Sequence, residues 1–319
     1  MKYIYLLSGG QNERDLAVAE AVALSGGRRC ADKLIESDTL VDIPRTAYIA
    51  AGIQLLAHGQ TVDDACRQLA ALHIASDRFG LEVIRVPRHL PVGRRESANA
   101  FALAIEGRPD LDHPAERFTA LLTPEGVWFG RTLESAPPDW LRFKHKPFDF
   151  SSALPAQNAR ALCNLLIRVA RPSWPCPENP RVIDPCCGSG TLLLHAAALG
   201  AHITGHDINP KMVGATNKNL EHFGSPPAAS LADAAEIRGA YDFVLTNIPY
   251  GNMSAVTAAA ARRIIANLVR LAPRGLIVAA HDITPDLTAS GATVRQLIQL
   301  PKFSVLRLIF LYERTTPLP

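Results

Sequence analysis

The residues best suited to chemistry lie in two short stretches of the chain. The first runs Arg-Val-Ile-Asp-Pro-Cys-Cys-Gly-Ser-Gly-Thr over 181–191, and the second runs Thr-Asn-Ile-Pro-Tyr-Gly over 246–251. Val182 and Ile183 end a short apolar run that is typical of a buried parallel strand. A glycine turn follows, and an apolar helical pattern begins at Thr191. A strand, a turn and a helix N-terminus in this order present backbone N–H groups to a polar ligand.

The charge beside this turn favours a cationic ligand over a dinucleotide. Gly188 and Gly190 let a ligand approach the main chain closely. A dinucleotide fingerprint needs a small residue at position 193, however, and Leu193 stands there. Asp184, four residues before the first glycine, would repel a pyrophosphate. S-adenosylmethionine carries a sulfonium and an ammonium group, so we expect this cofactor and rank dinucleotide-dependent oxidoreduction last.

Two further carboxylates follow the next strands. Asp207 lies in the strand pattern His202–Ile208, where it can accept both hydroxyls of a ribose. A role as N-cap of the helix expected over 210–223 explains Asp207 almost equally well. Asp233 follows the strand expected over 230–232, where it can meet an adenine amine or serve only as a turn residue.

The second stretch can hold a planar amine. Asn247 follows the apolar strand Phe243–Leu245, at the sheet edge where open α/β sheets bind ligands. Pro249 has no N–H and keeps Ile248 extended, which can aim the Ile248 carbonyl at the same point as the Asn247 side chain. Two acceptors on an exocyclic NH₂ would turn its lone pair toward a methyl donor. Tyr250 can stack on a flipped base; an ordinary Asn-x-Pro turn is the alternative.

The elements that must position these residues alternate between strand and helix, which indicates a doubly wound α/β sheet. A helix over 155–170 precedes them. Two final β-rich runs, 293–300 and 304–312, are only three residues apart. They must form an antiparallel hairpin, because a parallel pair needs a crossover of a dozen or more residues. We expect strands at 181–185, 202–208, 230–232, 242–247 and 276–281, and helices at 191–199, 210–223 and 254–271.

The first 132 residues predict a separate α+β architecture. A strand at 3–7, helices at 12–24, 62–75 and 97–105, a strand at 81–86 and a hairpin at 118–129 can be recognised. We therefore expect an N-terminal α+β, ferredoxin-like region over 1–60, a second region over 61–132, a proline-marked linker over 133–150, and a Rossmann-like domain over 151–319.

Composition excludes several classes of protein. The chain has 319 residues, of which 48% are hydrophobic and 20% charged, as in an ordinary globular protein. No apolar run reaches the roughly 18 residues of a membrane-spanning helix, and the first apolar stretch is too short for a signal peptide. The six cysteines show no paired metal spacing. We expect a reduced, cytoplasmic protein with no structural metal and no membrane contact.

The net charge of +3 does not by itself indicate nucleic-acid binding. Two stretches are locally basic, and either could be only a solvated surface. The first comprises Arg85, Arg88, His89, Arg94 and Arg95, and the second comprises Arg142, Lys144, His145 and Lys146. Together they favour a face that binds phosphates.

Three segments carry a resemblance to a known family. DPCCGSGTLLLHAA resembles the Asp-Pro-x-Cys-Gly-Ser-Gly-Thr signature of class I S-adenosylmethionine-dependent methyltransferases, and more narrowly that of the THUMP-domain RNA guanine-N2 methyltransferases that act on tRNA. GHDINPKMVGATNKNL is similar to the second-strand motif of this family, and PFDFSSALPAQNARALCNLL to its preceding helix. The resemblance is strong over about 145–314. It is weaker over 60–132, where EGRPDLDHPAERFTALLTPEGVWFG resembles the end of a THUMP domain.

The resemblance implies a cofactor site and a base site. The cofactor-binding set is Asp184, Cys186, Gly188, Gly190, Thr191, Asp207, Ile208, Asp233 and Asn247, and the catalytic set is Asn247, Pro249 and Tyr250. The family usually has two prolines after the Asn or Asp, whereas here Ile248 replaces the first. Asn-Ile-Pro-Tyr also resembles the motif of the rRNA adenine-N6 dimethyltransferases.

These observations predict methyl transfer from S-adenosylmethionine to an exocyclic base amine, with N2 of a tRNA guanosine as the first choice. Methylation of adenine N6 in rRNA or DNA is the alternative within the same chemistry, and a non-catalytic RNA-binding protein is the alternative of another class. The expected partner is tRNA or another structured RNA, and we favour a monomer.

Overall fold

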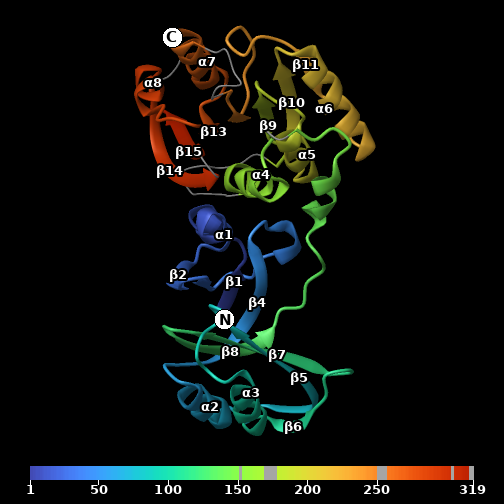
Figure 1. The fold of residues 1–319 in the computed structure, drawn as a ribbon, viewed down its shortest axis with the longest axis vertical. Helices are drawn as coiled ribbons and strands as arrows, with labels where there is room; N and C mark the ends of the chain where they lie inside the picture. The colour runs from blue at the N-terminus through green and yellow to red at the C-terminus, as the bar shows by residue number, and fades with distance from the viewer. Residues whose placement is uncertain (151–152, 169–177, 250–256, 303–304, 316–319) are drawn as a thin grey trace. The chain divides into compact units, whose positions relative to one another are not determined.

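The computed structural model describes residues 1–319 except 151–152, 169–177, 250–256, 303–304 and 316–319 (Figure 1). The chain divides into two units. The first unit comprises residues 1–8, 21–44 and 48–137, and the second comprises 9–20, 45–47 and 138–319.

The second unit is built on a seven-stranded sheet in the order β11-β10-β9-β12-β13-β15-β14. Its parallel strands are β9 (Arg181–Asp184), β10 (His202–Asp207), β11 (Ala229–Leu231), β12 (Phe243–Asn247) and β13 (Arg274–Ala279). β15 (Val305–Arg314) lies antiparallel to β13 and to β14 (Ala292–Lys302). The strand order reverses between β9 and β12, so ligands are expected beyond the carboxyl ends of these two strands. The sheet confirms the predicted Rossmann-like fold.

Helices pack on this sheet and bury its central strands. Val182, Val244 and Ile277 are fully buried, because helices lie on both faces of a parallel sheet (Figure 1). The helices are α4 (Ala156–Cys163), which continues as a π-helical turn over Asn164–Arg168, α5 (Thr191–Ala198), α6 (Pro210–His222), α7 (Ala258–Leu271) and α8 (Thr284–Ala289). The six-residue α8 was not predicted, because so short a helix leaves no clear periodic pattern.

Two segments from the beginning of the chain belong to the second unit. The buried Glu20 carboxylate lies in α1 (Arg14–Ser25), next to the 3₁₀ turn η1 (Gln11–Glu13). It accepts hydrogen bonds from Ala47 N at 2.8 Å and from Asn164 Nδ2 at 2.5 Å. Arg160 Nε donates to the Arg45 carbonyl at 3.1 Å, next to the 3₁₀ turn η2 (Ile43–Arg45). The bonds made by Asn164 and Arg160 join residues more than a hundred positions apart, which no local pattern reveals.

The predicted linker over 133–150 is also part of the second unit from residue 138 onward. Its 3₁₀ helix η3 (Asp139–His145) buries Trp140 and Phe143. Trp140 Nε1 donates to the Thr46 carbonyl at 2.7 Å, and Asp139 pairs with the buried Arg160. Residues 138–150 therefore belong to the second unit and not to a separate linker, because these aromatic side chains are buried within the unit.

The first unit contains one eight-stranded sheet in the order β2-β3-β1-β4-β8-β7-β5-β6. Its strands are β1 (Tyr3–Leu7), β2 (Arg28–Ala31), β3 (Leu34–Ser37), β4 (Ile49–Gly59), β5 (Ala75–Arg85), β6 (Glu106–Pro109), β7 (Glu116–Thr123) and β8 (Gly126–Thr132), with helices α2 (Val62–Ala71) and α3 (Arg94–Leu103). β4 pairs with β8 from Ile53–Thr132 to Gly59–Val127, so the predicted regions 1–60 and 61–132 share one sheet. The predicted boundary at residue 60 does not separate two folds.

Within the described ranges, none of the helices is long and apolar enough to cross a membrane. In the same part of the chain, no group of three or more His, Cys, Asp or Glu side chains is arranged to hold a metal ion.

Candidate active site

The glycine turn after β9 folds as the sequence predicts. Cys187 N donates to the His206 carbonyl at 2.8 Å, and Gly190 N donates to the Cys187 carbonyl at 2.9 Å. Gly188 has a φ of 55° and Gly190 a φ of 77°, which are left-handed conformations that favour glycine. A Cβ at Gly190 would also lie 2.7 Å from Thr216 Cγ2. The turn therefore requires its second glycine for both reasons, and α5 begins directly after it.

Asp184 is buried at the end of β9 and ties two elements together. Thr246 Oγ1 of β12 donates to its Oδ1 at 2.6 Å, and Cys186 N donates to the same atom at 3.2 Å. Burial raises the pKa of Asp184 to about 7, although both hydrogen bonds act in the opposite direction. A cation bound beside it would favour the ionised form. An ionised Asp184 would suit a cationic cofactor, so its cofactor role stays a prediction. Thr246 is a supporting residue that sequence reasoning missed.

Asp207 at the end of β10 holds two backbone groups. Its Oδ2 accepts from Gly188 N and its Oδ1 from Asn209 N, each at 2.9 Å. The alternative role of Asp207 as N-cap of α6 is wrong. Asn209 is the N-cap, and its side chain accepts from Lys211 N at 3.0 Å, because the cap directly precedes Pro210 at the first helical position.

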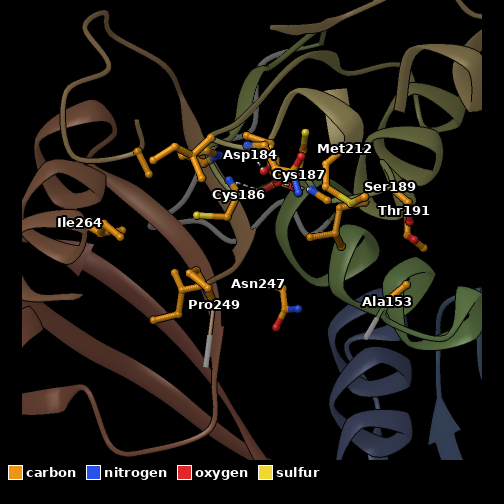
Figure 2. Close-up of a pocket in the computed structure, with 18 of the residues that line it drawn as sticks. Ala153, Asp184, Cys186, Cys187, Ser189, Thr191, Met212, Asn247, Pro249 and Ile264 are labelled. Carbon is orange, nitrogen blue, oxygen red and sulfur yellow. Dashed lines mark hydrogen bonds between the residues drawn. The ribbon is translucent and has the colours of Figure 1, made fainter. Parts of the chain in front are cut away.

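A cavity of about 530 Å³ opens beyond the carboxyl ends of these strands (Figure 2). In Figure 2, Ile264 lies on one side of this space and Ser189, Thr191 and Ala153 lie on the other. Nine predicted site residues line it: Asp184, Cys186, Gly188, Thr191, Asp207, Ile208, Asp233, Asn247 and Pro249. Gly190 shapes the turn without lining the cavity, and Tyr250 lies outside the described residues. The structure thus brings side chains from four strand ends to one place.

Several lining residues add properties that the motifs did not reveal. Ile208 is 72% exposed at the cavity, which leaves an apolar surface open to a planar ring. Burial raises the pKa of the Cys186 thiol well above its usual range, so this lining group is neutral. Asp233 Oδ1 accepts from Ala235 N at 2.8 Å. Asp233 therefore has the predicted turn role. It also lines the cavity, and its recognition of an adenine amine stays a prediction.

One wall of the cavity comes from residues before α4 that we call the wall segment (146–150 and 153–154). Phe150, Ala153 and Leu154 line the cavity, and Ala153 N donates to the Phe150 carbonyl at 2.9 Å. Met212, Ala260 and Ile264 complete the apolar lining. From residue 147 onward the wall segment lies within the stretch PFDFSSALP that resembles the methyltransferase family. Its role was not predicted, because it lies far along the chain from the motifs.

Asn219 of α6 fastens the wall segment to the glycine turn. Its Nδ2 donates to the carbonyls of Phe148 and Ser189, and its Oδ1 accepts from Phe148 N, each at 2.9 Å. The side chain is fully buried, so water cannot replace these bonds. All three contacts join segments far apart in the sequence.

Three buried polar atoms on the cavity residues have no hydrogen-bond partner among the residues that the structure describes. They are Asn247 Oδ1, Ser189 Oγ and Thr191 Oγ1. An unpartnered buried polar atom costs about 1–3 kcal/mol, so these atoms fit a ligand that supplies hydrogen bonds. A nucleoside with an amino-acid tail, such as S-adenosylmethionine, carries suitable groups. The residues present therefore fit this cofactor.

Ile248 occupies the position where the family that the sequence resembles usually has proline. The contacts of Ile248 explain why isoleucine is tolerated there. Its N–H donates to the Val278 carbonyl at 3.1 Å, a bond that proline could not make. Its side chain is 3% exposed and packs in a core cluster with Ile183 and Val244. The substitution therefore extends the pairing of β12 with β13 and leaves Asn247 at the cavity.

Comparison with known proteins identifies the domain. Residues 161–277 match the family described as RMKL-like, methyltransferase domain. This match supports a methyltransferase domain over these residues. S-adenosylmethionine is accordingly the cofactor of the methyltransferase domain, which confirms the prediction drawn from the turn and its carboxylates.

Curated relatives match parts of the chain. The tRNA (guanine(10)-N2)-dimethyltransferase of Methanothermobacter thermautotrophicus is 33% identical over 116 residues, or 35% of this chain and 32% of the relative. The ribosomal RNA small subunit methyltransferase C of Chromohalobacter salexigens is 28% identical over 172 residues, or 51% and 47%. The chain spans about a third of the length of the first of these relatives and about half of the second.

Solved structures share the fold over a greater length. TrmN from Thermus thermophilus is 21% identical and covers 98% of this chain and all of its own, with a TM-score of 0.53. A possible methylase from Clostridium difficile 630 is 13% identical and covers 100% and 99%, with a TM-score of 0.51. At these identities the likeness shows a common fold.

Proposed function

We propose that the protein transfers a methyl group from S-adenosylmethionine to an exocyclic amine of an RNA base, with N2 of a tRNA guanosine as the preferred target. The observation that carries this proposal is the buried Oδ1 of Asn247, which lines the cavity and has no hydrogen-bond partner among the described residues. The names of the relatives support it, because the one from Methanothermobacter thermautotrophicus is a tRNA guanine-N2 dimethyltransferase and the one from Chromohalobacter salexigens acts on ribosomal RNA.

Asn247 and its neighbours would act by positioning the amine. The Oδ1 of Asn247 would accept one N–H of the amine, and the Ile248 carbonyl would accept the other. The amine nitrogen would then present its lone pair to the electrophilic methyl group that the cofactor supplies. Transfer would form a bond from the nitrogen to the methyl carbon while the bond between that carbon and the cofactor's sulfur breaks with its electron pair left on sulfur. The nitrogen would then release a proton to solvent. Alignment of reactants can supply much of such a rate enhancement without a strong base.

Adenine N6 remains the second candidate because of one residue. Ile248 distinguishes this site from the Asn-Pro-Pro pattern, and Asn-Ile-Pro-Tyr resembles the adenine-N6 motif. Both amines present two N–H groups to the same pair of acceptors. A non-catalytic RNA-binding protein is less well supported, because three polar atoms without a partner in the described part of the chain belong to residues that line the cavity.

The first unit would position RNA by contacting phosphates, as a THUMP-like domain. Arg88, His89, Arg94 and Arg95 are exposed on or beside the start of α3. Arg85 has a structural role and leaves this group, since its Nη1 donates to the carbonyls of Leu90 and Val92 at 3.1 and 3.2 Å. Arg85 thereby braces the loop that carries Arg88 and His89 and leads into α3.

The test is mass spectrometry of nucleosides after incubation with S-adenosylmethionine and unmodified total tRNA. We expect N2-methylguanosine from the wild-type protein and at least a hundred-fold slower reaction from Asn247→Ala. Asn247→Asp keeps an acceptor oxygen and should lose less. Gln299→Ala, an exposed change on β14 far along the chain from the motifs, is the control. Detection of N6-methyladenosine in place of N2-methylguanosine would change the target from guanine to adenine. Unchanged activity of Asn247→Ala would show that the proposed site is wrong.

A further inference from the structure

A row of cations lies along one face of α6. Lys218 and His222 follow Lys211 by seven and eleven residues, which places the three side chains within about 40° of one another around the helix. All three are exposed, and none takes part in an ion pair within the described ranges. Gly214 lies on the same face, with no atom within 4 Å of where its Cβ would be. The face is therefore open as well as basic.

Ring contacts connect this row to the exposed cations of η3. The His222 and Phe223 ring centroids are 4.8 Å apart, and the Phe223 and Phe143 centroids are 5.0 Å apart. Arg142 lies over Phe143, with its Cζ 4.8 Å from the ring centroid. Lys144 and His145 follow in the same short helix and are exposed. These contacts place the two basic groups next to each other around Phe143 and Phe223.

An exposed aromatic ring lies within the same surface. Phe148 is 37% exposed, and the Nζ of Lys218 lies 5.4 Å from its ring centroid. Asn219 holds the main chain of Phe148 in place through both its N–H and its carbonyl. Phe150, two residues further on, lines the cofactor cavity, as do Asn209 and Met212 at the start of α6. The surface therefore begins at the cavity.

Most nearby carboxylates are already paired with other cations. Asp149 pairs with the buried Lys146, and Asp139 pairs with the buried Arg160. Lys146 was expected among the surface cations, but its side chain is only 4% exposed and it serves this internal pair. Glu221 is exposed on α6, about 60° around the helix from Lys218 and 100° from His222, and it takes part in no ion pair within the described ranges. The exposed side chains of this surface therefore carry a net positive charge.

We propose that this surface (Arg142, Lys144, His145, Phe148, Lys211, Lys218 and His222) binds the single-stranded RNA that flanks the target nucleotide. The proposal rests on the proposed function, because it takes RNA as the substrate. Cations would contact the phosphates, and a base would stack on Phe148, the combination by which proteins bind single strands. Lys211 to His222 span about 16 Å along the helix, long enough for several phosphates.

The test compares single-charge variants for binding to an unmodified tRNA transcript over a range of salt concentrations. A plot of log affinity against log salt concentration has a negative slope, and each lost phosphate contact reduces the magnitude of that slope by about 0.7 to 0.9. We expect this change for Lys218→Ala. Arg238→Ala is the matched control. Arg238 is exposed and takes part in no ion pair among the described residues. It precedes β12, whereas the cavity lies beyond the other end of that strand. Its slope should match that of the wild type.

Stacking is tested separately with Phe148→Ala and Phe148→Tyr. The alanine variant should bind the transcript about ten-fold more weakly, and the tyrosine variant, which keeps an aromatic face, should bind normally. Affinity for S-adenosylmethionine, measured by calorimetry, should stay unchanged in Lys218→Ala. Equal slopes for Lys218→Ala and the wild type, with normal tRNA binding, would overturn this surface and leave the proposed function intact. A wild-type protein that binds neither tRNA nor ribosomal RNA would contradict both.

Discussion

Replacing Asn219 with alanine should loosen one wall of the cofactor cavity. The change removes three hydrogen bonds of 2.9 Å that join α6 to Phe148 and Ser189. At about 1 kcal/mol net for each bond, the free energy of unfolding should fall by about 3 kcal/mol. The buried position of the side chain makes this loss greater than at an exposed site, because water cannot reach the groups left behind.

The effect on the cofactor follows from what Asn219 holds. The wall segment supplies Phe150, Ala153 and Leu154 to the cavity, and Asn219 fixes the main chain just before them. If half of the lost energy also opposes cofactor binding, the Kd for S-adenosylmethionine rises about ten-fold. Asn219→Asp should behave similarly, because a carboxylate can accept from Phe148 N but cannot donate to the two carbonyls.

Asn217→Ala is a control on the same helix that removes the same number of side-chain hydrogen bonds. Asn217 bonds only to the backbone of Ala228 and Ala229, which do not line the cavity. Urea unfolding followed by circular dichroism gives the stability of each variant, and calorimetry at a temperature where all are folded gives the Kd. A wild-type Kd in Asn219→Ala, despite lowered stability, would refute the positioning role.

Two further predictions concern buried carboxylates. The pKa of Asp184 is raised from 3.8 to about 7, so its contribution to folding is most favourable below pH 3.8 and is lost as the pH rises through 7. Because the cationic cofactor prefers the ionised form, its affinity measured by calorimetry should increase from pH 6 to pH 8, and Asp184→Asn should flatten this increase. Glu20→Ala leaves Ala47 N and Asn164 Nδ2 without their carboxylate acceptor and should lower the urea-unfolding free energy by about 2 kcal/mol. A fragment that begins at residue 133 lacks the same acceptor and should aggregate. A stable fragment that binds S-adenosylmethionine would contradict this prediction.

The sequence predicted the methyltransferase sheet well because its strands are short apolar runs between helical patterns. The sites at the ends of β9, β10 and β12 followed from the same reasoning, since parallel strands bring their carboxyl ends to one edge. The predictions failed where local patterns are weak. β2 and β3 have only four residues each and include the charged residues Arg28, Arg29 and Glu36, and the boundary at 60 was placed inside a sheet.

The sequence by itself determined which chemistry is proposed for this protein. The glycine turn, the carboxylate before it and the Asn-Ile-Pro-Tyr stretch are local features whose backbone and charge requirements are written in adjacent residues. Only the tertiary structure decided that Glu20 supports the second unit, that Asn219 holds the cavity wall, and that α6 and η3 share a basic surface. Each of these depends on side chains that meet residues far along the chain, and such contacts leave no periodic pattern in the sequence.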